Sequence, residues 1–444
     1  MTRPALTRVA RSLVERRPAD RWVEATHRVD TERRAIEEFI AAGTGHAYGF
    51  TTLLGHLDSG TMAAEEQVQV LGAHLVEPSW PAPPELRTLL VATKLEQLHH
   101  GGSGVHGATY RALLDAATRS TAPVLGGWTT SYGSGDVIPA AWLVHDLRTT
   151  TAPDLLRHPG DLIALINGSF VSTGFSIAAV IALVEQVGTF LDAWLPYCAR
   201  PTPTGPLDDL HPQPSAEPLD FTGQAPVSLR DSRPVLDVVV STVDRLGDSV
   251  ERRLARPSAN PLWSTSSGTA RPLSQSSFLD FRLALDLAAA VELAAVVAGH
   301  WQRLIEHVCA ALERRDPTRA PVQPPKAAQA VLEQVVGASG APRRYSGQDS
   351  RGVEDVRDMT LLHAQTLHSH VARLGALAVV WAQLVADHDL PVADAAGPVT
   401  DRLVEIFLGR PGLTESEHRR LRAVLARAGS ALTPRRDEPR AAHP

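Results

Sequence analysis

The sequence of 444 residues predicts a mainly α-helical fold, because apolar residues recur at helical spacing in two long segments and alternating strand patterns are scarce. Steps of three and four residues place the apolar positions of each segment on one face of a helix. These positions are Leu283, Leu287, Val291 and Ala294 in the first segment, and Leu367, Val371, Leu374, Ala378 and Trp381 in the second. The β-branched run at 236–240 is compatible with a strand or with a buried helical turn.

Two further apolar stretches, 170–187 and 283–301, contain polar and acidic residues, so we expect buried helices and no membrane span. The segment 200–226 contains seven prolines, which predicts an extended connection after a long helix that ends near Pro196. A second proline-rich break covers 315–325. The expected regions are an N-terminal region (1–160), a central helical bundle (161–312) interrupted by loop 200–226, a C-terminal helical region (313–433) and a disordered tail (434–444).

Composition excludes several classes of protein. The net charge is −6 with acids and bases interspersed, which disfavours a nucleic-acid partner and favours a small polar substrate. Cys198 and Cys309 are the only cysteines, so a disulfide scaffold and a Cys-rich zinc site are excluded and a cytoplasmic location is expected. The arginine-rich stretch 3–17 has no apolar segment behind it and is not a signal peptide.

The segment Gly133-Ser134-Gly135-Asp136 can convert its own backbone into an electrophile. If the amide nitrogen of Gly135 attacks the carbonyl carbon of Gly133 and Ser134 loses its hydroxyl group, two waters leave and a methylidene-imidazolone ring remains. Glycine on both sides allows the tight backbone geometry that ring closure requires. Asp136 could assist the closure or cap the next turn, and an ordinary turn that ends in an Asp N-cap is the simpler alternative.

Four segments, taken in order, resemble the aromatic amino acid ammonia-lyases and aminomutases, the family of histidine, phenylalanine and tyrosine ammonia-lyases. These segments are Ala47-Tyr48-Gly49-Phe50-Thr51-Thr52, Gly101-Gly102-Ser103-Gly104-Val105, Gly133-Ser134-Gly135-Asp136 and the stretch 161–174. The resemblance covers roughly residues 35–375. It implies an L-aspartase/fumarase-like long central helical bundle with a smaller N-terminal region that carries the methylidene-imidazolone loop. It also implies a homotetramer and no external cofactor.

Site residues follow from the resemblance position by position. Tyr48 matches the tyrosine that removes the β-proton, and Asn167, read as a mid-helix residue followed by Gly168, matches an amide that orients the substrate or the electrophile. Gln224 and Arg230 match a substrate-binding glutamine and the arginine that holds the amino-acid carboxylate. Val227 occupies the place of a further tyrosine of the family, so one hydroxyl group is missing. Plain alternatives are a core tyrosine, a helix kink and a surface arginine.

Two residues bear on the substrate. Glu354 matches a carboxylate of histidine ammonia-lyases, where it could receive the proton of the amino group or hold an imidazole; a capping acid in the first turn of a helix is the alternative. His74 belongs to the pair that selects the substrate ring, in a register that resembles either histidine or tyrosine lyases.

The leading hypothesis is an ammonia-lyase that releases ammonia from an aromatic or histidine-like amino acid and yields an α,β-unsaturated acid. A 2,3-aminomutase that makes a β-amino acid with the same residues is the nearest alternative. A non-catalytic homologue that acts as a binding protein is the second, because Val227 and the altered segment 275–278 depart from the family pattern.

Two other patterns are not expected to form sites. Residues 102–107 satisfy Gly-x-Gly-x-x-Gly, but they follow a helical pattern and no strand precedes them, which disfavours dinucleotide binding. His99 and His100 are adjacent and would diverge on a helix, so we expect no metal site.

Overall fold

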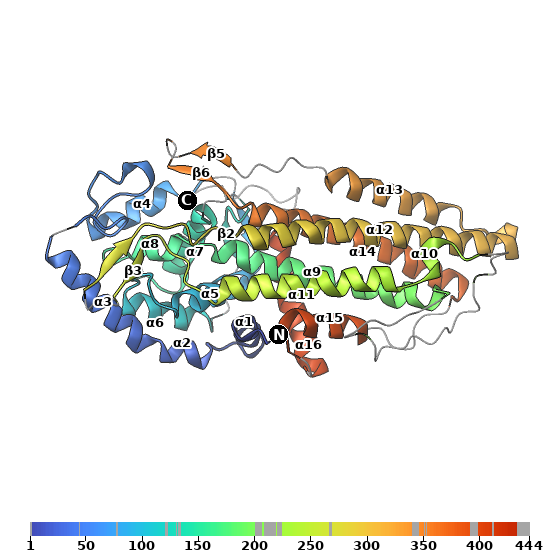
Figure 1. Cartoon of the computed structure of the whole chain (residues 1–444), viewed down its shortest axis with the longest axis horizontal. Coiled ribbons are helices and arrows are strands. Elements are labelled where there is room, and N and C mark those ends of the chain that lie inside the picture. The colour runs from blue at the N-terminus through green and yellow to red at the C-terminus, as the bar shows by residue number, and fades with distance from the viewer. Residues whose placement is uncertain are drawn as a thin grey trace.

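The computed structural model confirms the mainly α-helical fold (Figure 1). The structure describes residues 2–43, 45–76, 79–119, 123–129, 131, 135–199, 207, 219, 224–265, 269–339, 346–349, 351, 353–390, 398–410 and 413–432.

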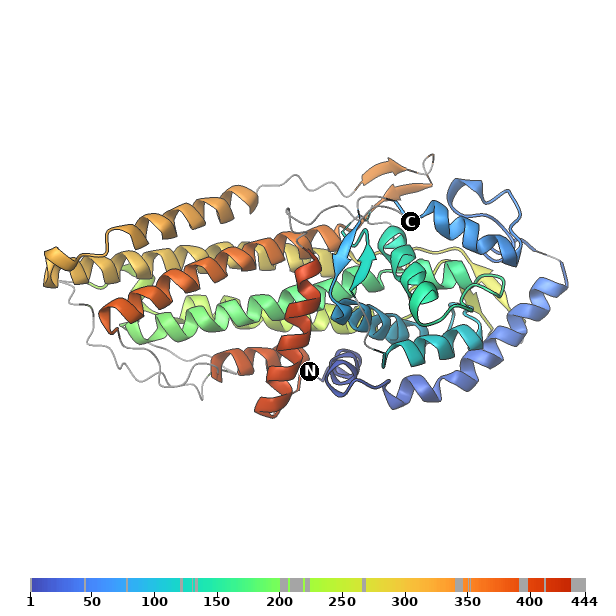
Figure 2. The same cartoon turned by 180° about the vertical axis from the view of Figure 1, so that it is seen from behind.

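Four long helices run side by side along the longest axis of the molecule (Figures 1 and 2). They are α9 (Phe170–Trp194), α11 (Arg233–Leu254), α12 (Phe281–Arg315) and α14 (Thr360–His388). Helix α13 (Gln323–Ser339) packs on α12 and α14. The two apolar stretches that the sequence placed in buried helices lie in α9 and α12, and the ambiguous run 236–240 is helical, within α11.

Helix α9 lies at the centre of this bundle because it is apolar all around. Nearly every residue from Phe170 to Trp194 is buried, which fits a helix that is surrounded by other helices. Near its end, Phe190 stacks on Trp194 at 5.3 Å between ring centroids and meets Trp301 of α12 at 5.6 Å. The helix ends at Trp194 and a 3-10 turn follows, close to the predicted end at Pro196.

The shorter helices gather at one end of the bundle, together with three two-stranded antiparallel sheets (Figures 1 and 2). The helices are α1 (Pro4–Glu15), α2 (Asp20–Glu24), α3 (Thr26–Ala41), α4 (Gln67–Ala73), α5 (Pro84–Leu98), α6 (Gly107–Ala116), α7 (Val137–Thr150) and α8 (Asp161–Ile166). The strand pairs are β1 (Trp80–Ala82) with β2 (Val124–Gly126), β3 (Leu262–Ser264) with β4 (Arg271–Leu273), and β5 (Ser346–Asp349) with β6 (Glu354–Val356).

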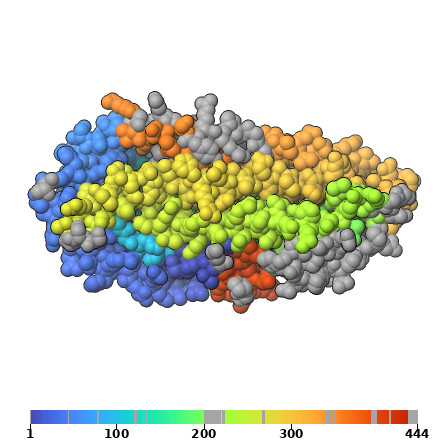
Figure 3. All heavy atoms as spheres, viewed as in Figure 1, coloured from blue at the N-terminus to red at the C-terminus, as the bar shows by residue number. Residues whose placement is uncertain are grey.

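The C-terminal helices α15 (Pro398–Leu408) and α16 (Glu415–Gly429) pack against α9, and α10 (Val227–Arg230) contacts α12. On the opposite face α12 stays uncovered along most of its length (Figure 3). Phe281, Leu285 and Val296 expose 40%, 57% and 42% of their surface there. Apolar side chains at this spacing form a stripe along one side of the helix.

Two segments, Asp161–Tyr197 and Thr360–His388, are long and apolar enough to cross a membrane by length and composition. In the first, 83% of the most apolar window is buried inside the protein, as expected for the core helix of a bundle. Most of the proline-rich connection 200–226 and the whole tail 434–444 lie outside the described residues.

Candidate active site

Gly135 and Asp136 begin the described part of the proposed electrophile segment, because Gly133 and Ser134 lie outside the described residues. Gly135 has a φ of +103°, a backbone conformation that residues with a Cβ rarely adopt. A Cβ at this position would stand 3.8 Å from the carbonyl oxygen of Gly168 and 3.9 Å from the ring of Phe278. The segment therefore meets the end of α8 on one side and an aromatic ring on the other.

Asp136 caps a different helix from the one that the sequence suggested. It precedes α7, but its side chain makes no capping hydrogen bond there. Its carboxylate instead accepts hydrogen bonds from the backbone nitrogen (2.7 Å) and hydroxyl group (2.9 Å) of Ser172, in the first turn of α9. Burial raises the pKa of Asp136 to about 7. The carboxylate thus ties the electrophile segment to the central helix.

Asn167 ends helix α8, which corrects the prediction of a mid-helix asparagine. The helix stops at Ile166, Asn167 has an extended backbone and Gly168 has a φ of +132°, so the Asn-Gly pair breaks the chain between α8 and α9. The backbone nitrogen of Asp136 donates to the Gly168 carbonyl at 2.8 Å. Asn167 is buried, and its Oδ1 atom has no hydrogen-bond partner among the described residues.

Lys94 and Gln97, one turn apart on α5, surround the same break, and motif reasoning did not single them out. The Lys94 ammonium donates to the Asn167 carbonyl at 3.0 Å and lies 4.8 Å above the ring of Phe170. Burial lowers the pKa of Lys94 to about 7, and the carboxylate of Asp136 partly opposes this. Neither amide atom of Gln97 has a hydrogen-bond partner among the described residues. Buried polar groups are normally paired, so these amides mark a place that is built for a further polar group.

The Tyr48 loop packs on the outer side of α8. Gly49 has a φ of +70°, and a Cβ there would stand 2.6 Å from the side chain of Ile163, so only glycine allows this approach. The Tyr48 hydroxyl group accepts a hydrogen bond from the backbone nitrogen of Gly55 at 2.8 Å. Burial raises the pKa of Tyr48, and the negative charge of Glu354 raises it further.

Glu354 lies in β6, before α14 begins at Thr360, so the alternative of a capping acid in the first turn of that helix is wrong. Its negative charge raises the pKa of Tyr48, so these two predicted residues lie within electrostatic range of each other. His74 caps the end of α4, and its Nδ1 atom lies 2.7 Å from the Val70 carbonyl oxygen, to which it donates as the N–H tautomer. Helix α4 contacts α8, which carries Asn167 at its end.

Gln224 and Arg230 lie away from the other predicted residues within one chain. Both are exposed, and α10, which contains Arg230, lies at the opposite end of the long bundle from α8 (Figure 1). Among the described residues, the Arg230 guanidinium donates to the carbonyl oxygen of Ala225 alone, at 3.0 and 3.2 Å. Val227 is 79% exposed at the place of the family tyrosine. A single chain therefore does not bring the proposed carboxylate-binding arginine to Tyr48.

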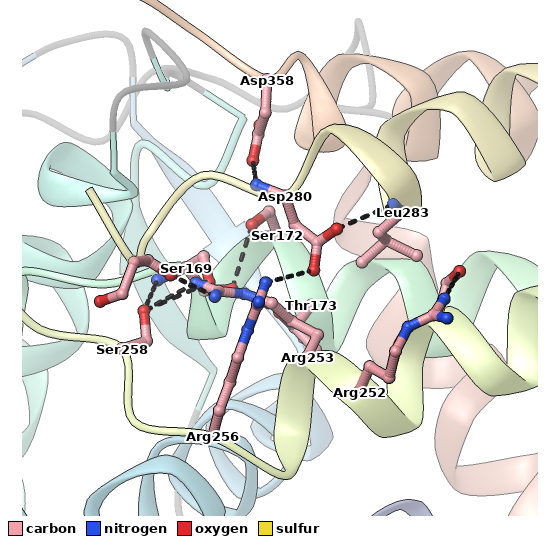
Figure 4. A network of polar contacts seen from close by, with 12 residues as sticks. Ser169, Ser172, Thr173, Arg252, Arg253, Arg256, Ser258, Asp280, Leu283 and Asp358 are labelled. Atoms are coloured by element: carbon pink, nitrogen blue, oxygen red, sulfur yellow. Dashed lines mark hydrogen bonds and ion pairs between the residues drawn. The ribbon is translucent and has the colours of Figure 1, made fainter.

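A buried arginine, Arg253 of α11, holds the far side of the Asn-Gly break (Figure 4). Its guanidinium donates to the hydroxyl groups of Ser169 and Ser258, the latter at 2.7 Å, and to the Ser277 carbonyl. Asp280 continues the network, since its carboxylate caps α12 at Leu283 and its own backbone nitrogen donates to Asp358 at 2.7 Å (Figure 4). These contacts fix the start of α9 against α11 and α12.

Sequence reasoning missed Lys94, Gln97 and Arg253. One usable signal was Lys94, a lysine within the apolar helical stretch 86–98, because lysine is almost never fully buried without a partner. A second was the helical spacing of Leu246, Val250 and Arg253, which places Arg253 on the apolar face of α11, whereas Arg252 lies off that face. The altered segment 275–278 lies next to the proposed electrophile segment, because the ring of Phe278 borders Gly135.

Comparison with known proteins relates part of the chain to aromatic amino acid lyases. A family model for aromatic amino acid lyases matches residues 1–149. Histidine ammonia-lyase of Paracidovorax citrulli is 30% identical over 174 residues, which cover 34% of this chain and 33% of that protein. Histidine ammonia-lyase of Burkholderia cenocepacia is 26% identical over 219 residues, 44% of this chain and 42% of that protein. The chain thus matches only about a third to two fifths of the length of these curated relatives.

Solved structures extend the likeness in fold to almost the whole chain. Phenylalanine aminomutase of Pantoea agglomerans covers 96% of this chain, which covers 98% of it, with a TM-score of 0.66 at 13% identity. For histidine ammonia-lyase of Trypanosoma cruzi the two shares are 94% and 90%, with a TM-score of 0.62 at 16% identity. The first 149 residues thus match the aromatic amino acid lyase family, and the fold of the chain is similar to that of these two solved enzymes.

Proposed function

We propose that this protein is an ammonia-lyase that eliminates ammonia from an aromatic or histidine-like amino acid and yields an α,β-unsaturated acid. Its electrophile would be a methylidene-imidazolone group formed autocatalytically from Gly133, Ser134 and Gly135, without an external cofactor. The observation that carries the proposal is the left-handed Gly135 next to Asn167, whose buried Oδ1 atom has no partner among the described residues.

The residues around the segment divide the chemistry between them. When present, the methylidene-imidazolone group supplies the electrophilic carbon that makes the amino group a better leaving group. Tyr48 would take the β-proton, which needs a base because this proton is barely acidic. Asn167 would orient the reacting groups, and Glu354 would receive the proton of the amino group. Arg230 would hold the substrate carboxylate through a bidentate contact.

The substrate class follows from Glu354 and His74, which favour a polar aromatic ring such as imidazole. The test is to incubate the purified protein with histidine, tyrosine or phenylalanine and to measure released ammonia. We expect release from at least one of them, with histidine first. No release from any of them by folded protein would favour the non-catalytic alternative, a binding protein without the reaction.

An aminomutase is the second candidate, because proteins named phenylalanine and tyrosine aminomutases share this fold. Such an enzyme would return the amino group to the β-carbon in the same site. Chiral chromatography of the product separates the two activities, since only the aminomutase yields a β-amino acid. We place either activity in the cytoplasm, in keeping with the two buried free cysteines.

We propose that the active form is a homotetramer, as the resemblance implies. The Tyr48 loop packs on α8 and Arg230 belongs to α10, and these two helices lie at opposite ends of the bundle (Figure 1). A site that contains both residues therefore needs at least a second chain, which supports an oligomer. The exposed apolar stripe on α12 offers a surface for that contact. The prediction is complementation. Tyr48→Phe and Arg230→Ala chains are each inactive, but unfolding and refolding them together restores a measurable share of wild-type ammonia release. Failure of the mixture, when wild type refolded in the same way recovers, would contradict a shared site.

Lys94→Met is expected to impair the site while the fold persists. Methionine fills the same space without a buried charge, so we expect a change in stability of less than about 1.5 kcal/mol. The Asn167 carbonyl, however, loses its ammonium donor, and a displaced amide can lower kcat on the order of 10²-fold. The readouts are kcat and the ring content, which is the fraction of chains whose segment 133–135 has lost two waters by closing the methylidene-imidazolone ring. A segment that has lost these waters is called the dehydrated segment. Lys94→Met chains with full ring content and wild-type kcat would show that Lys94 does not position the site.

A further inference from the structure

The chain turns sharply after α5, and this turn brings the rings of His99 and His100 together. Helix α5 ends at Leu98, and Gly101 and Gly102 follow with φ values of +84° and +80°. The two imidazole centroids are 4.0 Å apart, with an angle of 44° between the rings. We expected the two side chains to diverge on a helix, and this expectation is wrong. Helix α5 ends at Leu98, so His99 and His100 follow the turn and not the helix.

Each imidazole uses one ring nitrogen on a backbone carbonyl and keeps the other for a different partner. The Nδ1 atom of His99 lies 2.5 Å from the carbonyl oxygen of Glu96, and the Nε2 atom of His100 lies 2.9 Å from that of Leu254. Metal-binding histidines are usually oriented in this way, by an N–H bond from the nitrogen that does not bind the metal. The Nε2 atom of His99 is buried and has no hydrogen-bond partner among the described residues.

A carboxylate oxygen faces this free nitrogen. The Nε2 atom of His99 is 3.9 Å from Oε1 of Glu96, too far for a hydrogen bond. One possible ligand atom from each of Glu96, His99 and His100 lies within 4.8 Å of the others. Two ligand atoms about 2.0–2.2 Å from a tetrahedral zinc ion lie roughly 3.3–3.5 Å apart, so the gap of 3.9 Å would have to close by about half an ångström when the ion binds.

From this geometry we infer that Glu96, His99 and His100 form a binding site for a divalent transition metal of the zinc type. Two imidazoles and one carboxylate are a ligand set that such ions accept, with water in the remaining position. The site is independent of the proposed lyase reaction.

Arg8 of α1 competes with the ion for the carboxylate. Its guanidinium donates to Oε1 of Glu96 at 2.5 Å and to Oε2 at 3.1 Å, while the Trp22 indole donates to Oε2 at 2.6 Å. The Arg8 side chain is 22% exposed, so it can turn towards solvent, and Oε1 then becomes available while Trp22 still holds Oε2. Metal binding would therefore exchange a contact between α1 and α5 for a link between α5 and the turn that follows it.

Cobalt binding tests the site, because Co²⁺ replaces zinc and its visible absorption reports coordination by nitrogen and oxygen. The full-length protein is treated with a chelator, the chelator is removed, and Co²⁺ alone is titrated. We expect wild type to bind Co²⁺ and Arg8→Gln to bind it about tenfold more tightly, since the competing cation is gone. His99→Gln and His100→Gln should each weaken binding by at least about tenfold. His300→Gln, at a partly buried histidine of α12, is the matched control and should bind as wild type does.

The outcomes decide the proposal without reference to lyase activity. No Co²⁺ band in wild type or in Arg8→Gln overturns it. Binding that is equal in wild type, His99→Gln and His100→Gln overturns it as well, because the ion then sits elsewhere. Circular dichroism of each variant identifies a misfolded one. Because His100 is only partly buried, His100→Gln decides the question if His99→Gln does not fold.

Discussion

Replacing Tyr48 with phenylalanine is expected to lower kcat/KM for ammonia release by about 10²- to 10⁴-fold, the usual contribution of a positioned general base. The fold should persist, because the lost bond to the Gly55 nitrogen is worth only about 1 kcal/mol. The measurement is steady-state ammonia release, with circular dichroism as the folding control. A Tyr48→Phe enzyme within about threefold of wild type would remove Tyr48 from the reaction.

The pH dependence of wild-type activity also tests Tyr48 as the base. A base works when it is deprotonated, and burial raises the pKa of Tyr48 above its ordinary value of 10.0. Activity should therefore rise with pH through the neutral and mildly alkaline range. Glu354→Gln removes a negative charge that raises the same pKa, so it should shift the rising limb to lower pH. If the rising limb of the pH profile lies at the same pH in Glu354→Gln as in wild type, the charge of Glu354 does not affect the pKa of the catalytic base.

Arg253→Met is expected to destabilise the protein by about 3 kcal/mol, because the hydroxyl groups of buried Ser169 and Ser258 and the carbonyl oxygen of half-buried Ser277 lose their common donor. The matched control is Arg252→Met at the next position. Arg252 is exposed and donates only to the Ser249 hydroxyl group in the described part of the chain, at 2.8 Å, so we expect less than about 1 kcal/mol. Thermal melts of both variants measure the difference.

Equal melting temperatures for Arg252→Met and Arg253→Met would show that the network in Figure 4 contributes little to stability. A second readout concerns the site itself. Arg253 holds Ser169 directly after the Asn167-Gly168 break, so folded Arg253→Met should also carry less of the dehydrated segment. If Arg253→Met melts at a lower temperature but closes the ring in as many chains as wild type, Arg253 has a structural role only.

The fold was predictable because helical periodicity in long apolar segments reflects burial, and burial sets the architecture here. Helix α9 was found from its run of apolar residues, and α12 from its steps of three and four. Sequence reasoning did not resolve the run 236–240, because a short apolar stretch fits a strand or a helix equally well. It also placed Asn167 inside a helix, although the Asn-Gly pair ends α8 there.

The candidate site was predictable only where residues carry a motif. Tyr48, Asn167, Glu354 and the residues next to Ser134 were found in this way. Lys94, Gln97 and Arg253 reach the same region through tertiary packing, and local sequence does not encode which helix faces which.

Arg230 shows most clearly that a family motif can name a residue without showing where that residue lies in the fold. The motif names the residue, but the described chain leaves its guanidinium exposed at the far end of the bundle (Figure 1). Only assembly with another chain could bring it to Tyr48.

The most direct test of the proposed chemistry is the mass of the tryptic peptide 120–148, which contains Gly133, Ser134 and Gly135. We predict that this peptide from wild-type protein is lighter than its encoded mass by two water molecules, and that the peptide from Ser134→Ala protein is not. A wild-type peptide with the full encoded mass, from folded and assembled protein, would contradict the electrophile and leave a binding protein as the better interpretation.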